Sequence, residues 1–250
     1  MAAMEDVTAP WTMILDVRWR PTPRVYDGRT RLLLLLESQK RLRAFKIDDE
    51  IVRAVVGKDV EILLSPTHIS IADSTGSGDS EAFNAVLDAA KEAVDFRATS
   101  VSASFQHLVP FALRGDYEES RISAAKGLFG RSLVDGFTVT DTATLVDGKT
   151  EESGSLFKAE FGIVDREEAL ERLSKKFGRL RSSEQPDFSH VKFDEREISD
   201  AALYVDSTWH RHSKIPQNAG SEWFVNLGRE YSQEAGRLVS GVFRRVSVTG

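Results

Sequence analysis

Cysteine is absent from this chain of 250 residues. Its absence excludes disulfides, thiolate nucleophiles and cysteine-based zinc or iron–sulfur sites. A chain without disulfides is typical of a reducing compartment. Long apolar runs are also absent, because the longest, residues 32–36, is far shorter than the ~20 residues that a membrane helix requires. We therefore expect a protein that does not enter a membrane.

A secretory signal is not recognisable at the N-terminus. Such a signal needs a basic start followed by an apolar run of roughly 7–15 residues. Glu5 and Asp6 come early instead, and Asp16 and Arg18 interrupt the apolar stretch that follows. We expect a cytoplasmic protein.

Positive charge is not in excess. The chain has 33 Lys and Arg against 39 Asp and Glu, which gives a formal net charge of −6. General nucleic-acid binding depends on Lys and Arg neutralising phosphates, so nucleic acid is not an expected partner. The acidic balance instead predicts solubility.

Known catalytic and nucleotide-binding motifs are lacking as well. The sequence contains no G-x-S-x-G, no G-x-x-x-x-G-K-[ST] and no G-x-G-x-x-G. The glycine-rich stretch 75–80 follows a predicted strand and precedes a predicted helix, where backbone amides can bind a phosphate. Asp79 would repel that anion, so the stretch is interpreted as a connection in which Asp79 or Ser80 caps the helix. These absences favour a non-enzymatic protein without a cofactor.

The pattern of apolar residues predicts strands and helices in succession. Alternation and β-branched residues predict strands, and apolar residues at helical spacing predict helices. Strands are expected over 12–19, 60–72 (a hairpin), 99–109, 137–146, 155–164 and 202–211, and helices over 81–96, 118–129, 165–180 and 221–243.

Residues 31–47 are ambiguous. Their Leu, Glu, Gln, Lys and Arg favour a helix, yet the segment divides into two short apolar runs around a polar centre, which favours a hairpin. We take the hairpin as the expectation, with a short helical turn after it over residues 48–56.

Strands that follow one another between helices indicate an α+β protein. We expect an antiparallel sheet with long amphipathic helices packed on one face. The chain is expected to form a single domain over 1–250. Two β-rich units that each end in a helix, 1–98 and 99–250, remain an alternative.

Three stretches resemble an uncharacterised, sporadically distributed bacterial family of about 250 residues. They are the opening strand TMILDVRW; VEILLSPTHISIADS with the later FNAVLDAAKEAV and VSASFQHLVPF; and ALYVDSTW with the terminal GVFRRVSVT. Together they span most of the chain. The family has no established activity, so the resemblance implies a length and an order of strands and helices, and a bacterial source.

The chain also departs from the pattern of that family. The strand after the first helix usually carries an arginine–tyrosine–asparagine signature, whereas Phe105, Gln106 and His107 stand here. The order of strands and helices is distantly similar to that of SecB-type chaperones, as an analogy of topology alone.

The strand predicted near residues 202–211 carries the strongest candidate metal site. Asp206, His210 and His212 share one face of a regular strand, and imidazole and carboxylate are good ligands for transition metals. His107 or His68 could supply a further ligand. The alternative interpretation is a polar, solvated strand face.

The terminal helix raises the question of assembly. Its apolar side is wide and includes Trp223, Phe224 and Leu227, and Gly228 and Gly236 would permit the close approach of a neighbouring element. Packing within the chain is the preferred interpretation, and a homodimer through this helix is the alternative. Arg244 and Arg245 near its end are interpreted as charge complementing the helix dipole.

Taken together, these patterns favour a non-enzymatic protein-binding module, an adaptor or a chaperone-like protein, with a protein partner. The alternative is a metal-assisted enzyme or a small-ligand-binding protein that uses the strand face of Asp206, His210 and His212. RNA binding by the arginine-rich ends of the last two helices is a third hypothesis.

Overall fold

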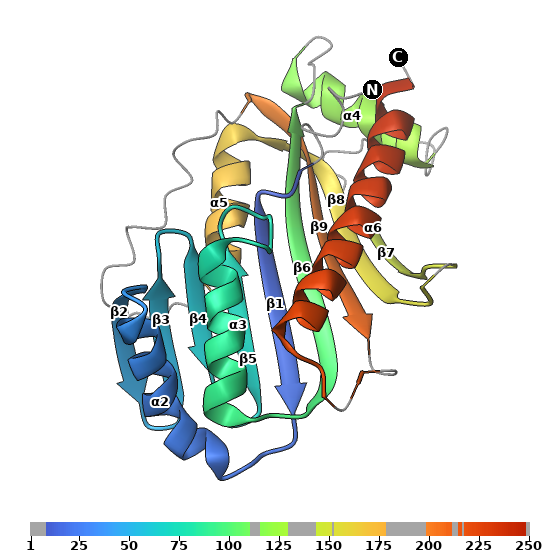
Figure 1. Ribbon diagram of the computed structural model, residues 1–250. Helices are drawn as coiled ribbons and strands as arrows, with labels where there is room; N and C mark the ends of the chain where they lie inside the picture. The colour runs from blue at the N-terminus through green and yellow to red at the C-terminus, as the bar shows by residue number, and fades with distance from the viewer. Residues whose placement is uncertain are drawn as a thin grey trace.

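The computed structural model describes residues 9–110, 116–129, 144–151, 153–178, 199–211, 215–216 and 218–248. Within these residues, nine strands form one antiparallel sheet and five helices pack against it (Figure 1). The α+β class with an antiparallel sheet, which the sequence predicts, is confirmed.

The strands of the sheet come from both halves of the chain. Their order across the sheet is β2-β3-β4-β5-β1-β6-β9-β8-β7. They are β1 (Thr12–Trp19), β2 (Leu42–Asp48), β3 (Ile51–Val56), β4 (Val60–Leu64), β5 (His68–Asp73), β6 (Ala98–Pro110), β7 (Thr144–Lys149), β8 (Leu156–Asp165) and β9 (Ala201–Arg211).

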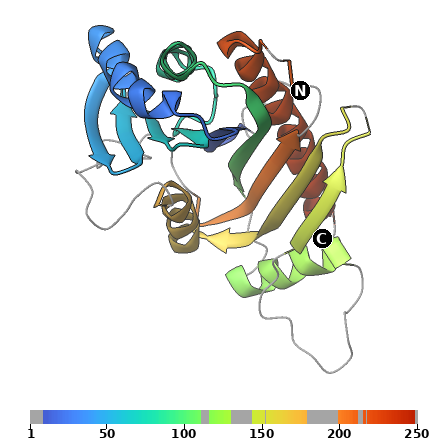
Figure 2. The ribbon, with the colours of Figure 1, turned by 90° about the horizontal axis from the view of Figure 1, so that it is seen from below.

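The helices are divided between the two faces of the sheet. α2 (Arg24–Ser38), α3 (Glu81–Val94) and α6 (Ser221–Val248) cover one face, and α4 (Tyr117–Phe129) packs against α6 and β8. α5 (Arg166–Gly178) lies on the other face (Figures 1 and 2). One predicted helix thus departs from the expectation that all helices share a face. Among the described helices, α5 is the one on this face, and we call the part of the face beyond α5 the open face.

Alternation along the strands explains which face is covered. On β1, Met13, Leu15 and Val17 are fully buried under the helices, and Asp16 and Arg18 point to the opposite face. α3 contributes the facing apolar stripe that the sequence predicts, and it begins at Ser80, whose hydroxyl accepts a hydrogen bond from the Phe83 amide at 3.2 Å.

The two halves of the chain occupy two contiguous blocks of the sheet. β1 to β5 form one block and β6 to β9 form the other, and the blocks meet where β1 pairs with β6. One core cluster joins Leu15 and Phe83 of the first block to Phe105 and Trp209 of the second. The boundary at residue 98 is therefore a seam between blocks, and the core is continuous across it.

The hairpin expected over 31–47 is wrong. Residues 24–38 form helix α2, and 42–48 form the strand β2. Leu32, Leu33 and Leu36 lie at helical spacing and are buried against the core. The helical turn expected after this segment is also wrong, because Ile51–Val56 is the strand β3.

The terminal helix packs within the chain. Phe224 is only 1% exposed, and Leu227 and Tyr231 are buried in the same core. A Cβ built on Gly228 would lie 2.8 Å from the Met13 methyl group, so the expected close approach occurs there, against β1. No such approach occurs at Gly236. The homodimer stays a prediction.

None of the helices in the described ranges combines the length and the apolar character that spanning a membrane would need.

Candidate functional site

The predicted metal-binding strand is β9, and it presents Asp206 and His210 on the open face of the sheet. Both side chains are partly buried, whereas Ser207 and Trp209 between them are buried under α6. His210 is four positions after Asp206, which corresponds to about 13 Å along a strand. His212 lies outside the described residues, so the three-ligand site stays a prediction.

The further ligands considered for this site lie elsewhere. His107 is completely buried on the helix-covered face. His68 is on the open face of β5, three strands from β9, a lateral separation of about 14 Å. Within the described ranges, no three His, Asp or Glu side chains are close enough to hold a metal ion.

Asp206 belongs instead to a polar network at the end of the sheet that α5 covers. Thr12 donates a hydrogen bond to Gln106 at 2.9 Å, Gln106 donates to the Tyr204 hydroxyl at 2.9 Å, and Tyr204 donates to Asp206 at 3.2 Å. Burial, and then the charge of Asp206, raise the pKa of Tyr204 above its usual value. The network joins β1, β6 and β9 by side-chain hydrogen bonds, and the hydroxyl groups of Thr12 and Tyr204 are both engaged in it.

Arg172 of α5 closes this end of the face. Its guanidinium lies 2.8 Å from Glu160 and 2.7 Å from Glu168, and 5.0 Å from the centre of the Tyr204 ring. Burial alone would lower the pKa of Arg172, but hydrogen bonds to both carboxylates outweigh it and the pKa is raised. The guanidinium is therefore a permanent positive charge that holds α5 on the sheet.

A groove of about 510 Å³ occupies the open part of the same face, beyond the polar network. It crosses the ends of β1, β6, β9, β8 and β7. Its lining residues are Arg18, Ser100, Val101, Ser102, Asp147, Gly148, Leu156, Phe157, Lys158 and His210. The volume is within the range of small-molecule sites.

The polar side chains of the groove are two cations, Arg18 and Lys158, one carboxylate, Asp147, two serine hydroxyls and the His210 imidazole. Arg18 forms no ion pair with any residue that the structure describes. Lys158 is 3.7 Å from Asp147, but both side chains are about two-thirds exposed, so solvent weakens the pair. Arg18 is therefore the lining cation that no lining carboxylate balances.

Of the groove residues, the sequence singles out only His210 as a functional candidate. Arg18, Ser100, Ser102 and Lys158 were missed. One signal was present: Ser100, Ser102 and Ser104 recur at every second position of a predicted strand, which places three hydroxyls on one face.

The glycine-rich loop 75–80 already surrounds an anion of its own. The buried carboxylate of Asp73 accepts hydrogen bonds from the Thr75 amide at 2.9 Å, the Thr75 hydroxyl at 2.7 Å and the Gly78 amide at 2.9 Å. These donors are not available to a phosphate. The interpretation of the loop as a connection ending in an N-cap is therefore supported.

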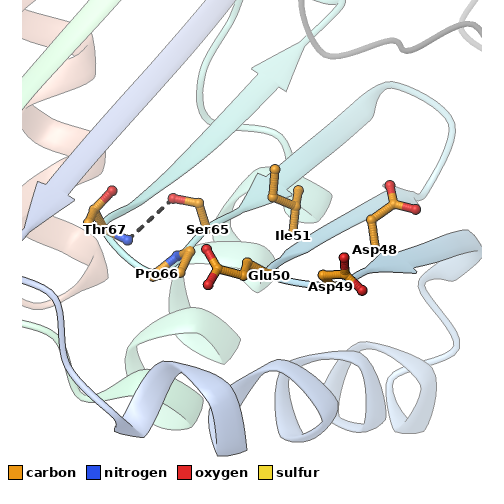
Figure 3. A pocket seen from close by; sticks show the side chains of 7 residues that line it. All are labelled: Asp48, Asp49, Glu50, Ile51, Ser65, Pro66 and Thr67. Carbon is orange, nitrogen blue, oxygen red and sulfur yellow. Dashed lines mark hydrogen bonds between the residues drawn. The ribbon is translucent and has the colours of Figure 1, made fainter.

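A second pocket, of about 450 Å³, lies at the β2 end of the sheet. Figure 3 shows that the acidic turn 48–50 and the turn 65–67 line it. Asp48 pairs with Arg53 at 2.7 Å and with Lys46 at 3.1 Å, and Glu50 accepts a hydrogen bond from Tyr26 at 3.3 Å. Of the three carboxylates of this turn, Asp48 is thus the one that the printed ion pairs neutralise.

Exposed apolar side chains gather on the strand that leads into this turn. Phe45 is 54% and Ile47 is 48% exposed, and both belong to β2, whose one partner among the described strands is β3. Tyr26 and Leu34 of the neighbouring helix α2 are also exposed. We call these four residues the β2 edge patch.

No protein-family model matches this chain, and no curated protein sequence matches it either. The resemblance to the sporadic bacterial family and to SecB-type chaperones therefore stays a prediction.

Proposed function

We propose that this chain is a non-enzymatic protein-binding module that takes an extended segment of a partner protein along the edge strand β2. The observation that carries the proposal is the combination of a strand edge that no other described strand pairs with and exposed apolar side chains at every second position, Phe45 and Ile47. Natural proteins usually protect such an edge, because it is a template for pairing with another chain.

The chemistry of strand addition fits this edge. The free backbone groups of β2 would supply main-chain hydrogen bonds to the added strand, and side chains at alternate positions would give specificity. Phe45 pairs with Ala54 and Ile47 with Val52, both buried beneath the helices, so the exposed rings and methyl groups stand on the helix-covered side. Tyr26 of α2 is also exposed, and its hydroxyl donates a hydrogen bond to Glu50 just beyond the end of β2.

The opposite edge of the sheet is less suited to the same role. β7 exposes Leu145, but Asp147 and Lys149 follow it on the same face, and Gly148 stands between them. Charged residues on an edge strand discourage pairing. β2 also carries charges, but Lys46 and Asp48 pair with each other on the opposite face from Phe45 and Ile47, and Arg43 is the one charged residue of the strand on the apolar side. The partner segment is therefore assigned to β2, with apolar residues at alternate positions.

The test begins with selection of peptides from a random phage-displayed library against the folded chain. The affinity of a selected peptide is then measured by fluorescence polarisation. The double variant Phe45→Glu/Ile47→Glu should bind at least ten times more weakly, because two charges replace the apolar contacts. The control Leu145→Glu, on the opposite edge, should bind as tightly as the wild type.

Hydrogen exchange supplies a second readout. Amides of residues 42–48 should gain protection when the peptide binds, since they would become paired, whereas amides of β7 should not change. Equal affinity for the double variant, or protection that appears elsewhere, would overturn the proposal.

A further inference from the structure

The groove on the open face of the sheet has no role in the proposed binding of a protein segment, because it lies at the other end of the sheet from β2. Its lining residues suit a different kind of ligand. The register of the strands determines which of these side chains are neighbours.

Ser100 and Ser102 form the floor of the groove. They lie two residues apart on β6, so both hydroxyls point to the open face. Ser104, the next residue on that face, is engaged with the Thr208 hydroxyl at 2.9 Å. Ser100 and Ser102 make no such contact with the residues that the structure describes. Two hydroxyl groups about 7 Å apart along the strand are therefore available as donors.

Basic side chains stand on both sides of this floor. Arg18 of β1 is directly opposite Ser100, and His210 of β9 is directly opposite Ser102. Neighbouring strands are about 4.8 Å apart, so an ion above β6 would be within reach of both side chains. Arg and His donors combined with hydroxyl donors form a typical surrounding for an anion with several oxygens.

Two further residues of the groove, Leu156 and Lys158, indicate what the rest of the ligand would contact. Leu156 is opposite His210 on the far side, half exposed, and offers an apolar wall. Lys158, two residues further along β8, also lines the groove, and Asp147 at 3.7 Å offsets part of its charge. The groove thus joins a site rich in hydrogen-bond donors to an apolar surface.

We propose that the groove binds a small organic phosphate monoester, with the phosphate above Ser100 and Ser102 between Arg18 and His210, and the organic part against Leu156. A tetrahedral phosphate offers enough oxygens for donors that converge from three strands, whereas a carboxylate offers two. Phosphate also favours the planar fork of an arginine.

Two carboxylates oppose this assignment: Asp147, which lines the groove and is paired with Lys158, and Asp16, which gives the sharper test. Asp16 is directly opposite Ser102 on β1 and accepts a hydrogen bond from Ser70 on the side away from the groove. It does not line the groove, but its negative charge lies near the proposed phosphate. Removing that charge should strengthen binding, and removing Arg18 should weaken it.

The experiment uses phenyl phosphate, inorganic phosphate and benzoate as probes on the full chain, with affinities from calorimetry at low salt. Phenyl phosphate should bind more tightly than inorganic phosphate because of Leu156, and more tightly than benzoate because of its oxygens. Arg18→Gln should weaken phenyl phosphate binding at least tenfold, and Asp16→Asn should strengthen it severalfold. Arg20→Gln, an exposed cation outside the groove, is the matched control and should leave binding unchanged.

Imidazole resonances locate the ligand independently. The chain has five histidines, and the signal that disappears in His210→Asn should be the one that moves most during the phosphate titration. Thermal unfolding of each variant establishes that it is folded. No binding of phenyl phosphate at millimolar concentration, equal binding by Arg18→Gln and Arg20→Gln, or weaker binding by folded Asp16→Asn would overturn the proposal.

Discussion

Phe157 and Trp209 are direct neighbours across β8 and β9, and their rings stack with centroids 4.9 Å apart. On its other side, Phe157 pairs with Gly148 of β7, where a built Cβ would lie 2.5 Å from the Phe157 ring. The glycine therefore makes room for the ring, and the stack joins three strands under α6.

Gly148→Ala should disturb this stack. The new methyl group would push the Phe157 ring against Trp209, and overpacking of this kind costs roughly 1–3 kcal/mol. Urea unfolding followed by tryptophan fluorescence measures both the loss of stability and a change in the Trp209 environment. Gly236→Ala is the matched control, because no atom lies within 4 Å of its built Cβ, and in a helix it should stabilise by about 0.5–1 kcal/mol. A Gly148→Ala protein as stable as the wild type would contradict the assigned contact.

Phe224→Glu should unfold the chain and should not merely separate subunits. The ring is buried in the core with Phe96 at 6.0 Å between ring centroids. Loss of a buried Phe side chain costs about 3–5 kcal/mol even without a buried charge. Circular dichroism and light scattering measure folding and mass. Leu34→Glu, at an exposed position of α2, should change stability by less than about 0.5 kcal/mol. If the wild type is a dimer and Phe224→Glu is a folded monomer, the result would support a homodimer that forms through α6.

His68 should make stability depend on pH in the mildly acidic range. Burial lowers its pKa from 6.5, Asp16 partly opposes this, and Arg18 reinforces it. Its Nδ1 is 2.6 Å from the Ser65 hydroxyl. Because the folded pKa is below the unfolded one, the unfolded chain binds the proton more readily. The contribution of neutral His68 is fully present above the unfolded pKa of 6.5 and is lost as the pH falls below that value and through the lower folded pKa.

The measurement compares the wild type with His68→Gln by urea unfolding at pH 8 and at several values down to pH 5. The difference in the free energy of unfolding between the two proteins should become smaller as the pH falls. This difference isolates His68, because the carboxylates that cause general acid destabilisation are common to both proteins. A constant difference across this range would show that His68 does not titrate differently in the folded chain.

Local patterns predicted most of the elements. The stripe of α3, its Ser80 cap and the alternation of β6 depend on residues close together in the sequence, so they are visible there. The five leucines before residue 37 suit either a short strand or a helix, and burial against the core selected the helix. The error over 31–47 therefore arose from tertiary packing.

The candidate groove could not be predicted in the same way. Arg18 and His210 line the same groove because β1 and β9 are the two neighbours of β6 in the sheet. This order is set by pairings between distant segments, which no periodicity records. The sequence could indicate that His210 faces away from Trp209, but not which residues it faces. The β2 edge patch was hidden for a related reason: the expected hairpin paired this strand with residues that form α2, whereas β2 pairs with β3.

The contacts of Arg172 lead to the last prediction, which concerns how α5 is held. Arg172 pairs with Glu160 of β8 and with Glu168 of its own helix, so Arg172→Met should leave two carboxylates without their shared cation. Hydrogen bonds to charged groups contribute roughly 1.5–3 kcal/mol, and a loss at the lower end is expected because all three side chains are partly exposed. Arg172→Lys keeps the charge but not the planar fork, so its loss of stability should be intermediate.

Hydrogen exchange measures the effect on the helix itself. Compared with the wild type, Arg172→Met should exchange faster in α5 and at the same rate in α3, whose contacts do not involve Arg172. Arg166→Met, at an exposed position of the same helix, is the control and should exchange as the wild type does. If Arg172→Met leaves α5 as protected as the control does, the apolar contacts of Ala169 and Leu173 hold the helix without the ion pairs.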